Sequence, residues 1–334
     1  MIFVTGGTGL VGAHVLLKLS KDFKEFKALK RESSSLEVCR NIFSYYKAND
    51  LFDNINWIDG DLNDIASLEE GMEECDLLLH CAGIVSFSSS DIEILKKVNI
   101  EGTANIMNVA LGSGIKKVGY VSSIATLGNN SNSDLIDENC HFRATKKTST
   151  YALSKYFAEQ EVWRASAEGL DVIIINPSVI LGPGDWTKGS SKVFEKIYNG
   201  LKFYTEGSTG YVDVIDVAAS LIELLFSDIK NERFIVNGKN LKYRDCFDRI
   251  AIALGKPKAT IKVTHFLKEI AWRIELVKSL FLNSNPLLTK ETANNAMTKR
   301  AFSTSKIQNF IGFKFNNIDD TIKKYSEWFI SNQV

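Results

Sequence analysis

This 334-residue sequence lacks several features that would assign it to a familiar functional class. Lys plus Arg and Asp plus Glu both total 40, so there is no overall basic field to hold nucleic acid. The five cysteines are scattered without a Cys-x-x-Cys pair, and the four histidines show no ligand spacing. We therefore expect free thiols in a reducing cytoplasm, with neither a disulfide framework nor a metal centre.

Long apolar runs are also missing. No stretch reaches about 18 uninterrupted apolar residues, the length at which a membrane-spanning helix is expected. The first apolar run begins at Ile2, so we expect no signal peptide ahead of it. Residues 265–282 have apolar side chains at helical spacing, and we expect this helix to pack over the rest of the protein. A helix on a membrane surface is the alternative.

Short apolar runs alternate with helical patterns through the first half of the chain. The strand-like runs are residues 2–5, 26–30, 55–60, 76–81, 117–123 and 171–177. The clearest helical patterns between them are residues 11–20, 91–111 and 151–167. This alternation predicts an α/β fold of the Rossmann type, with a doubly wound parallel sheet and helices on both faces.

The alternation breaks after Pro177, at the turn-rich segment GPGDWTKGSS. We assign residues 1–177 to a first domain to which residues 210–240 return. Within the returning part, the strand-like run RFIVNG (233–238) is expected to rejoin the main sheet. Residues 178–209 and 241–334 are assigned to a smaller, C-terminal substrate-binding region.

The first predicted strand runs directly into the segment TGGTGLVG. Glycine costs backbone entropy, so a cluster of glycines needs a geometric reason. Gly6, Gly9 and Gly12 form a G-x-x-G-x-x-G pattern between a strand and a helix. In such a turn the first glycine permits a tight bend, the second admits a pyrophosphate, and the third lets the helix lie close to the strand. The pattern predicts a dinucleotide with its phosphates at a helix N-terminus.

The end of the second predicted strand is where the adenosine ribose of such a cofactor would be recognised. An NAD site typically has Asp or Glu there, but this sequence has Lys30 and Arg31, followed by Glu32. Because cations pair with a 2′-phosphate, we prefer NADP(H) as the cofactor. Glu32 in another register would serve NAD(H), which remains the alternative.

Acid–base chemistry is expected at YALSK, where Tyr151 and Lys155 lie four residues apart on one helix face. A nearby ammonium favours the phenolate, so we expect Lys155 to lower the pKa of Tyr151 from its usual value near ~10. Lys155 can also hold ribose hydroxyls. Ser123, with Ser122 as its competitor, ends another strand and can donate to a carbonyl oxygen that becomes alkoxide-like.

Together, TGGTGLVG, VSSIATLG and YALSK resemble the extended short-chain dehydrogenase/reductases of the NAD-dependent epimerase/dehydratase superfamily. The resemblance is strong over residues 1–240 and weak beyond. The catalytic residues that it implies are Ser123, Tyr151, Lys155 and Asn99. With the residues discussed above, the implied cofactor-binding set is Gly6, Thr8, Gly9, Leu10, Gly12, Lys30, Arg31, Asp61, Leu62, Cys81, Ala82, Gly83, Tyr151, Lys155, Pro177, Ser178 and Val179. The resemblance also implies a homodimer formed through the helices at 91–111 and 151–167.

The sequence favours one branch of this family. Sugar-nucleotide enzymes need cationic clamps for a diphosphate, but no arginine lies between Arg164 and Arg233. The segments HCAGIVSF and GSTGYVDVID instead resemble the dihydroflavonol-reductase and 3β-hydroxysteroid-dehydrogenase branch, which acts on carbonyls or alcohols of apolar molecules. The candidate substrate residues are Val85, Phe87, Ser123, Trp186, Phe203 and Tyr204.

We therefore expect an NADP(H)-dependent oxidoreductase that reduces a carbonyl, or oxidises an alcohol, of a small apolar substrate, with Tyr151 as the proton donor. Two alternatives remain open at this point. One is an NAD-dependent nucleotide-sugar epimerase or dehydratase, and the other is a non-catalytic regulatory protein that binds a dinucleotide. A small-molecule substrate is the expected partner, without nucleic acid or a membrane span.

Overall fold

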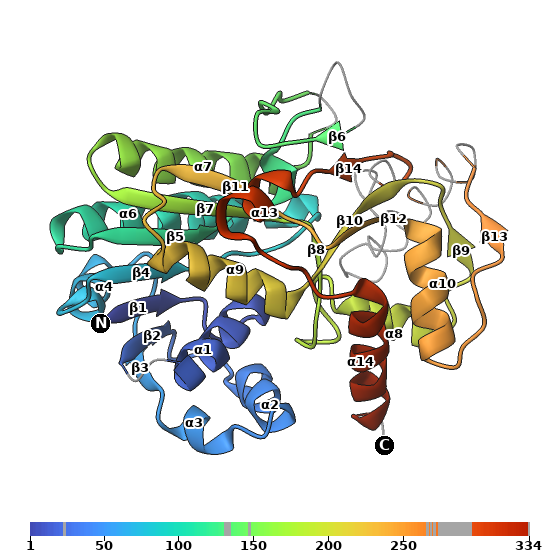
Figure 1. Ribbon diagram of the computed structural model, residues 1–334, viewed down its shortest axis with the longest axis horizontal. Coiled ribbons are helices and arrows are strands. Elements are labelled where there is room, and N and C mark those ends of the chain that lie inside the picture. The colour runs from blue at the N-terminus through green and yellow to red at the C-terminus, as the bar shows by residue number, and fades with distance from the viewer. Residues whose placement is uncertain are drawn as a thin grey trace.

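The computed structural model describes residues 1–22, 25–129, 135–145, 148–264, 267, 269, 272 and 296–332. Within these residues the largest sheet has seven parallel strands in the order β11-β7-β5-β4-β1-β2-β3 (Figure 1). The strands are β1 (Ile2–Thr5), β2 (Phe26–Lys30), β3 (Asn56–Asp59), β4 (Leu77–His80), β5 (Lys117–Val121), β7 (Asp171–Pro177) and β11 (Glu232–Val236). The doubly wound α/β fold predicted from the sequence is confirmed.

Both faces of this sheet are buried, as its near-continuous apolar strands predict. Successive residues of a strand point to opposite faces. In β7, Ile173 and Ile175 belong to one buried cluster, whereas Val172 and Ile174 belong to another. The sheet therefore separates two hydrophobic layers, each of which needs its own covering helices.

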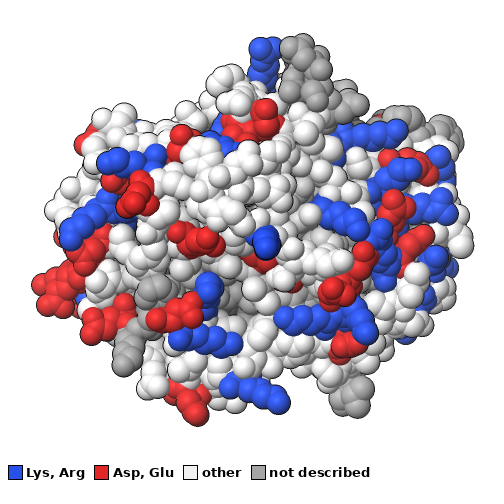
Figure 2. Space-filling model, viewed as in Figure 1, with Lys and Arg blue, Asp and Glu red and all other residues white. Residues whose placement is uncertain are grey.

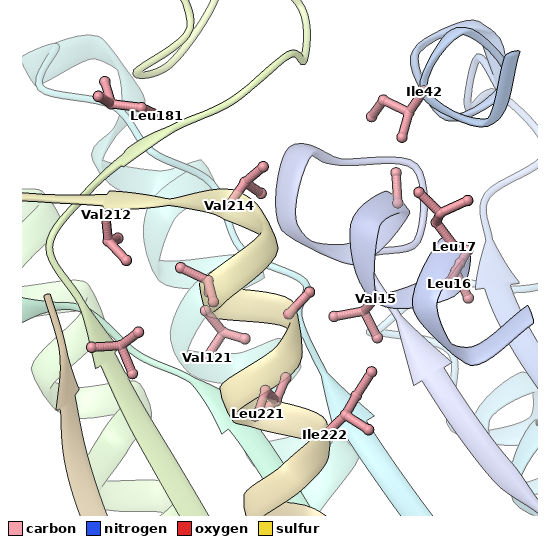
Figure 3. Packing of buried hydrophobic residues seen from close by; sticks show 14 of the residues in the cluster. Val15, Leu16, Leu17, Ile42, Val121, Leu181, Val212, Val214, Leu221 and Ile222 are labelled. Atoms are coloured by element: carbon pink, nitrogen blue, oxygen red, sulfur yellow. The ribbon is translucent and has the colours of Figure 1, made fainter. Parts of the chain in front are cut away.

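The first layer is covered by α1 (Leu10–Asp22) and α9 (Val214–Phe226), which pack against each other. Figure 3 shows Val15 of α1 facing Ile222 of α9 in this layer. Two short helices, α2 (Glu37–Tyr45) and α3 (Asn49–Asp53), extend it beside α1. The second layer is covered by α4 (Ile65–Met72), α6 (Gly102–Gly112) and α7 (Thr150–Ala167).

The predicted helix at 91–111 is composed of several segments. A 3-10 turn, Ser89–Asp91, precedes α5 (Ile92–Leu95), and a π-helical segment, Lys96–Glu101, joins α5 to α6. Wide turns of this kind occur often at functional sites. Here the π-helical segment contains Asn99, whose side chain is buried. The sequence predicted the helix but gave no sign of its widened turn.

The smaller region surrounds a three-stranded sheet of β8 (Val179–Leu181), β10 (Ser208–Asp213) and β12 (Lys239–Lys242). Two further two-stranded sheets pair β9 (Phe203–Tyr204) with β13 (Ile261–Lys262), and β6 (Leu135–Ile136) with β14 (Ala301–Phe302). The further helices are α8 (Lys192–Tyr198), α10 (Tyr243–Ala253), α13 (Ser305–Ile311) and α14 (Ile318–Ser331), with a 3-10 turn at Ile124–Thr126.

Residues 210–240 return to the main sheet only in part. Helix α9 and strand β11 do so, and β11 pairs with β7 as expected for the run at 233–238. Strand β10, by contrast, pairs with β8 and β12 in the small sheet. Most of the helical pattern predicted at 265–282 lies outside the described residues.

The C-terminal helix α14 is tied to the start of α9 by buried hydrogen bonds. Asp213 caps α9 by accepting from the Ile215 N–H at 2.9 Å. The same carboxylate accepts from Thr321 Oγ1 at 2.8 Å and from Tyr325 Oη at 2.7 Å. The end of the chain therefore helps to fix a helix that packs directly under the main sheet.

On the face that Figure 2 shows, acidic and basic side chains are interspersed over the surface. Among the residues that the structure describes, no helix is long and apolar enough to cross a membrane. All five cysteines are free thiols.

Candidate active site

The glycine-rich turn lies where the sheet changes direction. Strand β1 is flanked by β2 on one side and β4 on the other, and ligands of open α/β sheets bind at the carboxyl ends of such strands. Gly6 has φ +75°, and a Cβ atom there would lie 2.5 Å from the Ala82 backbone nitrogen. A Cβ atom at Gly12 would lie 2.1 Å from the Gly6 carbonyl oxygen. The turn and the helix are thus closely packed against β1 and the end of β4.

Gly9 differs from these two glycines, because it is exposed at the turn. Its N–H donates to the Gly6 carbonyl at 3.0 Å, and the nearest atom to a Cβ there would be 3.5 Å away. Thr8 and Leu10 flank it, and α1 begins at Leu10. An open backbone at a helix N-terminus fits a pyrophosphate. The geometry therefore suits the predicted dinucleotide.

The end of β2 presents one engaged cation and one exposed cation. Lys30 Nζ forms an ion pair with Asp59 at the end of β3. Arg31 is exposed immediately after β2. Asp61 accepts hydrogen bonds from the Asn63 backbone and side chain, both at 2.9 Å. Burial raises the pKa of the Asp61 carboxyl, but these hydrogen bonds together with Arg31 and Lys97 outweigh burial, so the pKa is lowered. The Lys30 pair was not foreseen, and it leaves Arg31 as the exposed cation at this end of β2.

The remaining predicted cofactor residues line the carboxyl edge of the sheet. Leu62 packs beneath Gly102 of α6. Cys81 and Ala82 follow β4. The Cys81 N–H donates to the Thr5 carbonyl at 3.2 Å, and the Ala82 N–H donates to Thr5 Oγ1 at 3.4 Å. Pro177 ends β7, Val179 begins β8, and between them the buried Ser178 hydroxyl has no hydrogen-bond partner within the described chain. A polar group left unpaired at this edge is consistent with a bound ligand there.

The structure brings Ser123 and Tyr151 together. Tyr151 lies in the first turn of α7, which begins there because Ser149 caps it, accepting from the Ala152 N–H at 3.0 Å. Ser123 follows β5, and its hydroxyl lies close enough to the Tyr151 phenol to lower the pKa of that phenol. Ser122 instead donates to Glu159 at 2.5 Å, so Ser123 is the serine placed beside the phenol.

Lys155 is buried one helical turn after Tyr151 but does not interact as expected. Its Nζ donates to Tyr120 Oη at 2.7 Å and to the Val121 carbonyl at 2.9 Å, rather than to Tyr151. Burial lowers the pKa of Lys155 to about 8, while Glu159 and Cys81 act in the opposite sense. Burial raises the pKa of Tyr151 above its usual value, and the nearby Ser123 hydroxyl partly offsets this rise. The expected lowering of this pKa by Lys155 is thus absent from the structure.

Asn99 holds the loop after β4 against α7. Its Oδ1 accepts from the Ile84 N–H at 2.8 Å, and its Nδ2 donates to the Ile84 carbonyl at 3.0 Å and to Ser154 Oγ at 2.9 Å. A Cβ atom at Gly83 would lie 3.4 Å from Asn99 Oδ1 and 3.7 Å from Lys155 Nζ. The absence of a side chain at Gly83 therefore leaves space beside the Lys155 ammonium.

The predicted substrate residues are divided between two places. Phe87 packs edge-on against Tyr151, with ring centroids 5.4 Å apart, and Val85 in the same loop is 55% exposed. Trp186 instead packs among Phe194, Trp328 and Phe329. Trp186 is partly buried in this aromatic cluster, and within the described residues its ring contacts do not include Phe87 or Tyr151.

Phe203 and Tyr204 form β9 in the smaller region. Phe203 is 51% exposed, and Tyr204 lies under the Arg244 guanidinium, 4.3 Å from ring centroid to Cζ. Their contacts lie within the small region: Phe203 and Tyr204 pair with β13, and Tyr204 contacts Arg244.

Two residues at the site were not foreseen from the sequence. Tyr120 accepts from Lys155, and its ring stacks on His80 with centroids 5.4 Å apart. Glu159 lies four residues after Lys155 and accepts hydrogen bonds from three other segments. The four-residue spacing from Tyr151 through Lys155 to Glu159 was the one signal available for Glu159.

The model of the NAD dependent epimerase/dehydratase family matches residues 2–232. The chain belongs to this family. It is 29% identical over 335 residues to a putative dihydroflavonol 4-reductase of Synechocystis sp., covering 98% of this chain and 94% of that one. It is 24% identical to a decarboxylating sterol-4-alpha-carboxylate 3-dehydrogenase of Dictyostelium discoideum, covering 86% and 88%. The crystal structure of gox2253 is 28% identical, with a TM-score of 0.81 over 99% of this chain and 98% of that chain.

These relatives identify the chain as an extended short-chain dehydrogenase/reductase, related to dihydroflavonol reductases and 3β-hydroxysteroid dehydrogenases. It is an NAD(P)-dependent enzyme of the oxidoreductase type. The fold and the family resemblance predicted from the sequence are confirmed.

Proposed function

We propose that this enzyme is an NADP(H)-dependent reductase of a carbonyl group on a small apolar substrate, and that it also catalyses the reverse oxidation of the alcohol. The observation that carries the proposal is that the Ser123 hydroxyl and the Phe87 ring both lie beside the Tyr151 phenol. This arrangement provides two adjacent hydroxyl donors with an apolar surface next to them.

The roles of these residues follow from their surroundings. When bound, the reduced nicotinamide supplies a hydride to the substrate carbonyl carbon. Tyr151 donates its proton to the carbonyl oxygen, and its raised pKa keeps the phenol protonated at neutral pH. Ser123 donates a hydrogen bond to the same oxygen as negative charge develops on it. Lys155, charged below about pH 8, provides a cation near the phenol and a donor for ribose hydroxyls.

An apolar substrate is favoured by the residues that surround the phenol. Phe87 offers an aromatic face and Val85 an exposed aliphatic side chain. Hydrophobic and aromatic linings with few polar groups are typical of small-molecule sites. Relatives named as a dihydroflavonol 4-reductase and a sterol 3-dehydrogenase support a substrate of this class.

NADP(H) is favoured over NAD(H) by Arg31. Its guanidinium is exposed directly after β2, whereas the neighbouring Lys30 is paired with Asp59. A planar guanidinium pairs well with a phosphate, so Arg31 is our candidate for contact with the 2′-phosphate.

Five free thiols support a reducing compartment such as the cytoplasm.

The test is NADPH oxidation by the purified protein against a panel of aldehydes and ketones, followed at 340 nm. We expect turnover by the wild type and a loss of about 100-fold or more in kcat for Tyr151→Phe. Unchanged turnover in Tyr151→Phe would reject the assigned proton donor. Tight copurified NAD with interconversion of a UDP-sugar would instead establish an epimerase. Dinucleotide binding without any turnover would indicate a regulatory protein.

A further inference from the structure

Glu159 is an unusual residue for the middle of a helix that packs on a sheet. Its side chain is 1% exposed, although carboxylates are almost never fully buried unless they are paired. It lies four residues after Lys155 and eight after Tyr151, so the three side chains share one face of α7. A buried charge in line with two catalytic residues requires an explanation.

The carboxylate joins several segments at the active-site edge of the sheet. Its Oε2 accepts from Ser122 Oγ at 2.5 Å, from Thr126 Oγ1 at 2.8 Å and from Asn176 Nδ2 at 3.0 Å. Asn176 Nδ2 also reaches the Ser123 carbonyl at 3.2 Å. Ser122 and Thr126 bracket Ser123, so these bonds fasten the segment that carries Ser123 to the helix that carries Tyr151.

The second carboxylate oxygen faces a cation. Arg233 Nη1, from β11, lies 3.3 Å from Glu159 Oε1. Arg233 is itself held by the Glu138 carbonyl, which accepts from both Nε and Nη2. Four donors therefore satisfy a group that, when ionised, can only accept. Such pairing is what allows a carboxylate to remain charged in a buried site.

The charge of Glu159 also acts on Lys155. Burial is the larger effect and lowers the pKa of Lys155, and Glu159 is the largest influence that opposes it. Other titratable or charged groups surround these two residues on every packed element. They are His80 and Cys81 from the end of β4, Tyr120 from β5, Tyr151 from α7 and Arg233 from β11. Among them, Arg233 forms an ion pair with Glu159, and the Glu159 side chain is the more deeply buried of the two.

We propose that Glu159 is a positioning residue of this active site: its carboxylate fixes the Ser123 segment against α7 and supplies the buried negative charge that keeps Lys155 an ammonium ion. The proposal rests on the function proposed above for Tyr151 and Lys155. It gives Glu159 two separable effects, one through hydrogen bonds on the geometry of Ser123 and one through charge on Lys155.

The test compares Glu159→Gln, which removes the charge, with Ser122→Ala, which removes one hydrogen bond and leaves the charge. For carbonyl reduction, kcat/KM should fall as pH rises and Lys155 loses its proton. In Glu159→Gln we expect this fall to begin about one pH unit lower than in the wild type, because an adjacent opposite charge shifts a pKa by about that much or more. In Ser122→Ala we expect a several-fold lower kcat. The fall of kcat/KM with rising pH should begin at the same pH as in the wild type.

Removing Glu159 alone leaves Arg233 without its buried partner and can prevent folding. The double variant Glu159→Gln with Arg233→Gln removes both charges, and circular dichroism will report whether each variant folds. The folded double variant should still show a displacement to lower pH, because Glu159 is the charge of this pair that acts on Lys155 most strongly. A merely structural role would lower the melting temperature and the rate at every pH without moving the profile, and that result would overturn the proposal.

The pH dependence of NADPH affinity, measured by fluorescence titration, provides a readout without turnover. Because Lys155 is proposed to donate to ribose hydroxyls, the dissociation constant should rise with pH, and earlier in Glu159→Gln. If the wild type binds NADPH but reduces no carbonyl, the proposed function fails while this comparison still decides the role of Glu159. If the dissociation constant depends on pH in the same way in the wild type and in Glu159→Gln, the role of Glu159 is rejected and the proposed function is unaffected.

Discussion

The aromatic rings of Phe87 and Tyr151 meet edge-on, with their centroids 5.4 Å apart. Phe87 comes from the loop after β4, and Tyr151 comes from the first turn of α7. The contact therefore joins the loop after β4 to the start of α7. An apolar substrate whose carbonyl reaches the phenol would then lie against the Phe87 ring.

Truncation of this ring should weaken substrate binding more than catalysis. For Phe87→Ala we expect KM for an apolar ketone to rise about tenfold, since burial of a large apolar side chain contributes roughly 1.5–3 kcal/mol. Steady-state kinetics will measure the change. Trp186→Phe is the comparison, because Trp186 packs in a separate aromatic cluster, and this variant should lower the melting temperature with KM unchanged. Equal KM for Phe87→Ala and wild type would place the substrate elsewhere.

The two cations after β2 should differ in their effect on the cofactor. We expect Arg31→Ala to weaken NADPH binding by about 10-fold or more while NADH binding is unchanged, because a charge-assisted hydrogen bond contributes about 1.5–3 kcal/mol. Lys30→Ala should have a smaller effect, since its ammonium is paired with Asp59. Fluorescence titrations with both coenzymes test this. If Arg31→Ala weakens both coenzymes equally, the preference for NADP(H) has another origin.

Gly9 and Gly12 should respond differently to the same substitution. A Cβ atom at Gly12 would lie 2.1 Å from the Gly6 carbonyl oxygen, so Gly12→Ala should lower the melting temperature by several degrees. At Gly9 the nearest atom is 3.5 Å away, so the fold should tolerate Gly9→Ala. The added methyl group would instead obstruct the phosphates, and NADPH affinity should fall at least tenfold. Normal NADPH binding by Gly9→Ala would remove the glycine turn from the cofactor site.

His14 should make the protein less stable in acid. Burial is the main reason that its pKa falls from 6.5 to about 4. Between these values the unfolded chain binds a proton that the folded chain does not, so stability present above pH 6.5 is lost as the pH falls. Between pH 6.5 and 5 this contribution is about 2 kcal/mol. Urea unfolding at pH 7 and pH 5 will measure the loss of unfolding free energy between the two. This loss should be smaller in His14→Gln than in the wild type, and in the exposed variant His141→Gln it should equal that of the wild type.

Much of the fold could be predicted because its signals are local. The run DVIIINP predicted a strand over the same residues, 171–177, that β7 occupies. Its uninterrupted apolar character is what a strand covered on both faces requires. Strand β10 was harder to place, because its pairing with β8 and β12 depends on contacts with distant segments.

The site was predictable only where one segment carries the chemistry. Tyr151 and Lys155 lie on a single helix, and their spacing reveals their shared face. The aromatic cluster around Trp186 depends on Trp328, which follows 142 positions later in the sequence and could not be paired with it from sequence alone. Likewise, nothing in the sequence near Glu159 indicates that Ser122, Asn176 and Arg233 converge on it.

The link between Asp213 and α14 has a consequence for biosynthesis. Asp213 is 3% exposed, and its partners Thr321 and Tyr325 are translated more than 100 residues after it. While the ribosome is still making α14, this carboxylate lacks those two hydroxyl donors. The bonds that join α14 to the start of α9 can therefore form only after α14 has been synthesised.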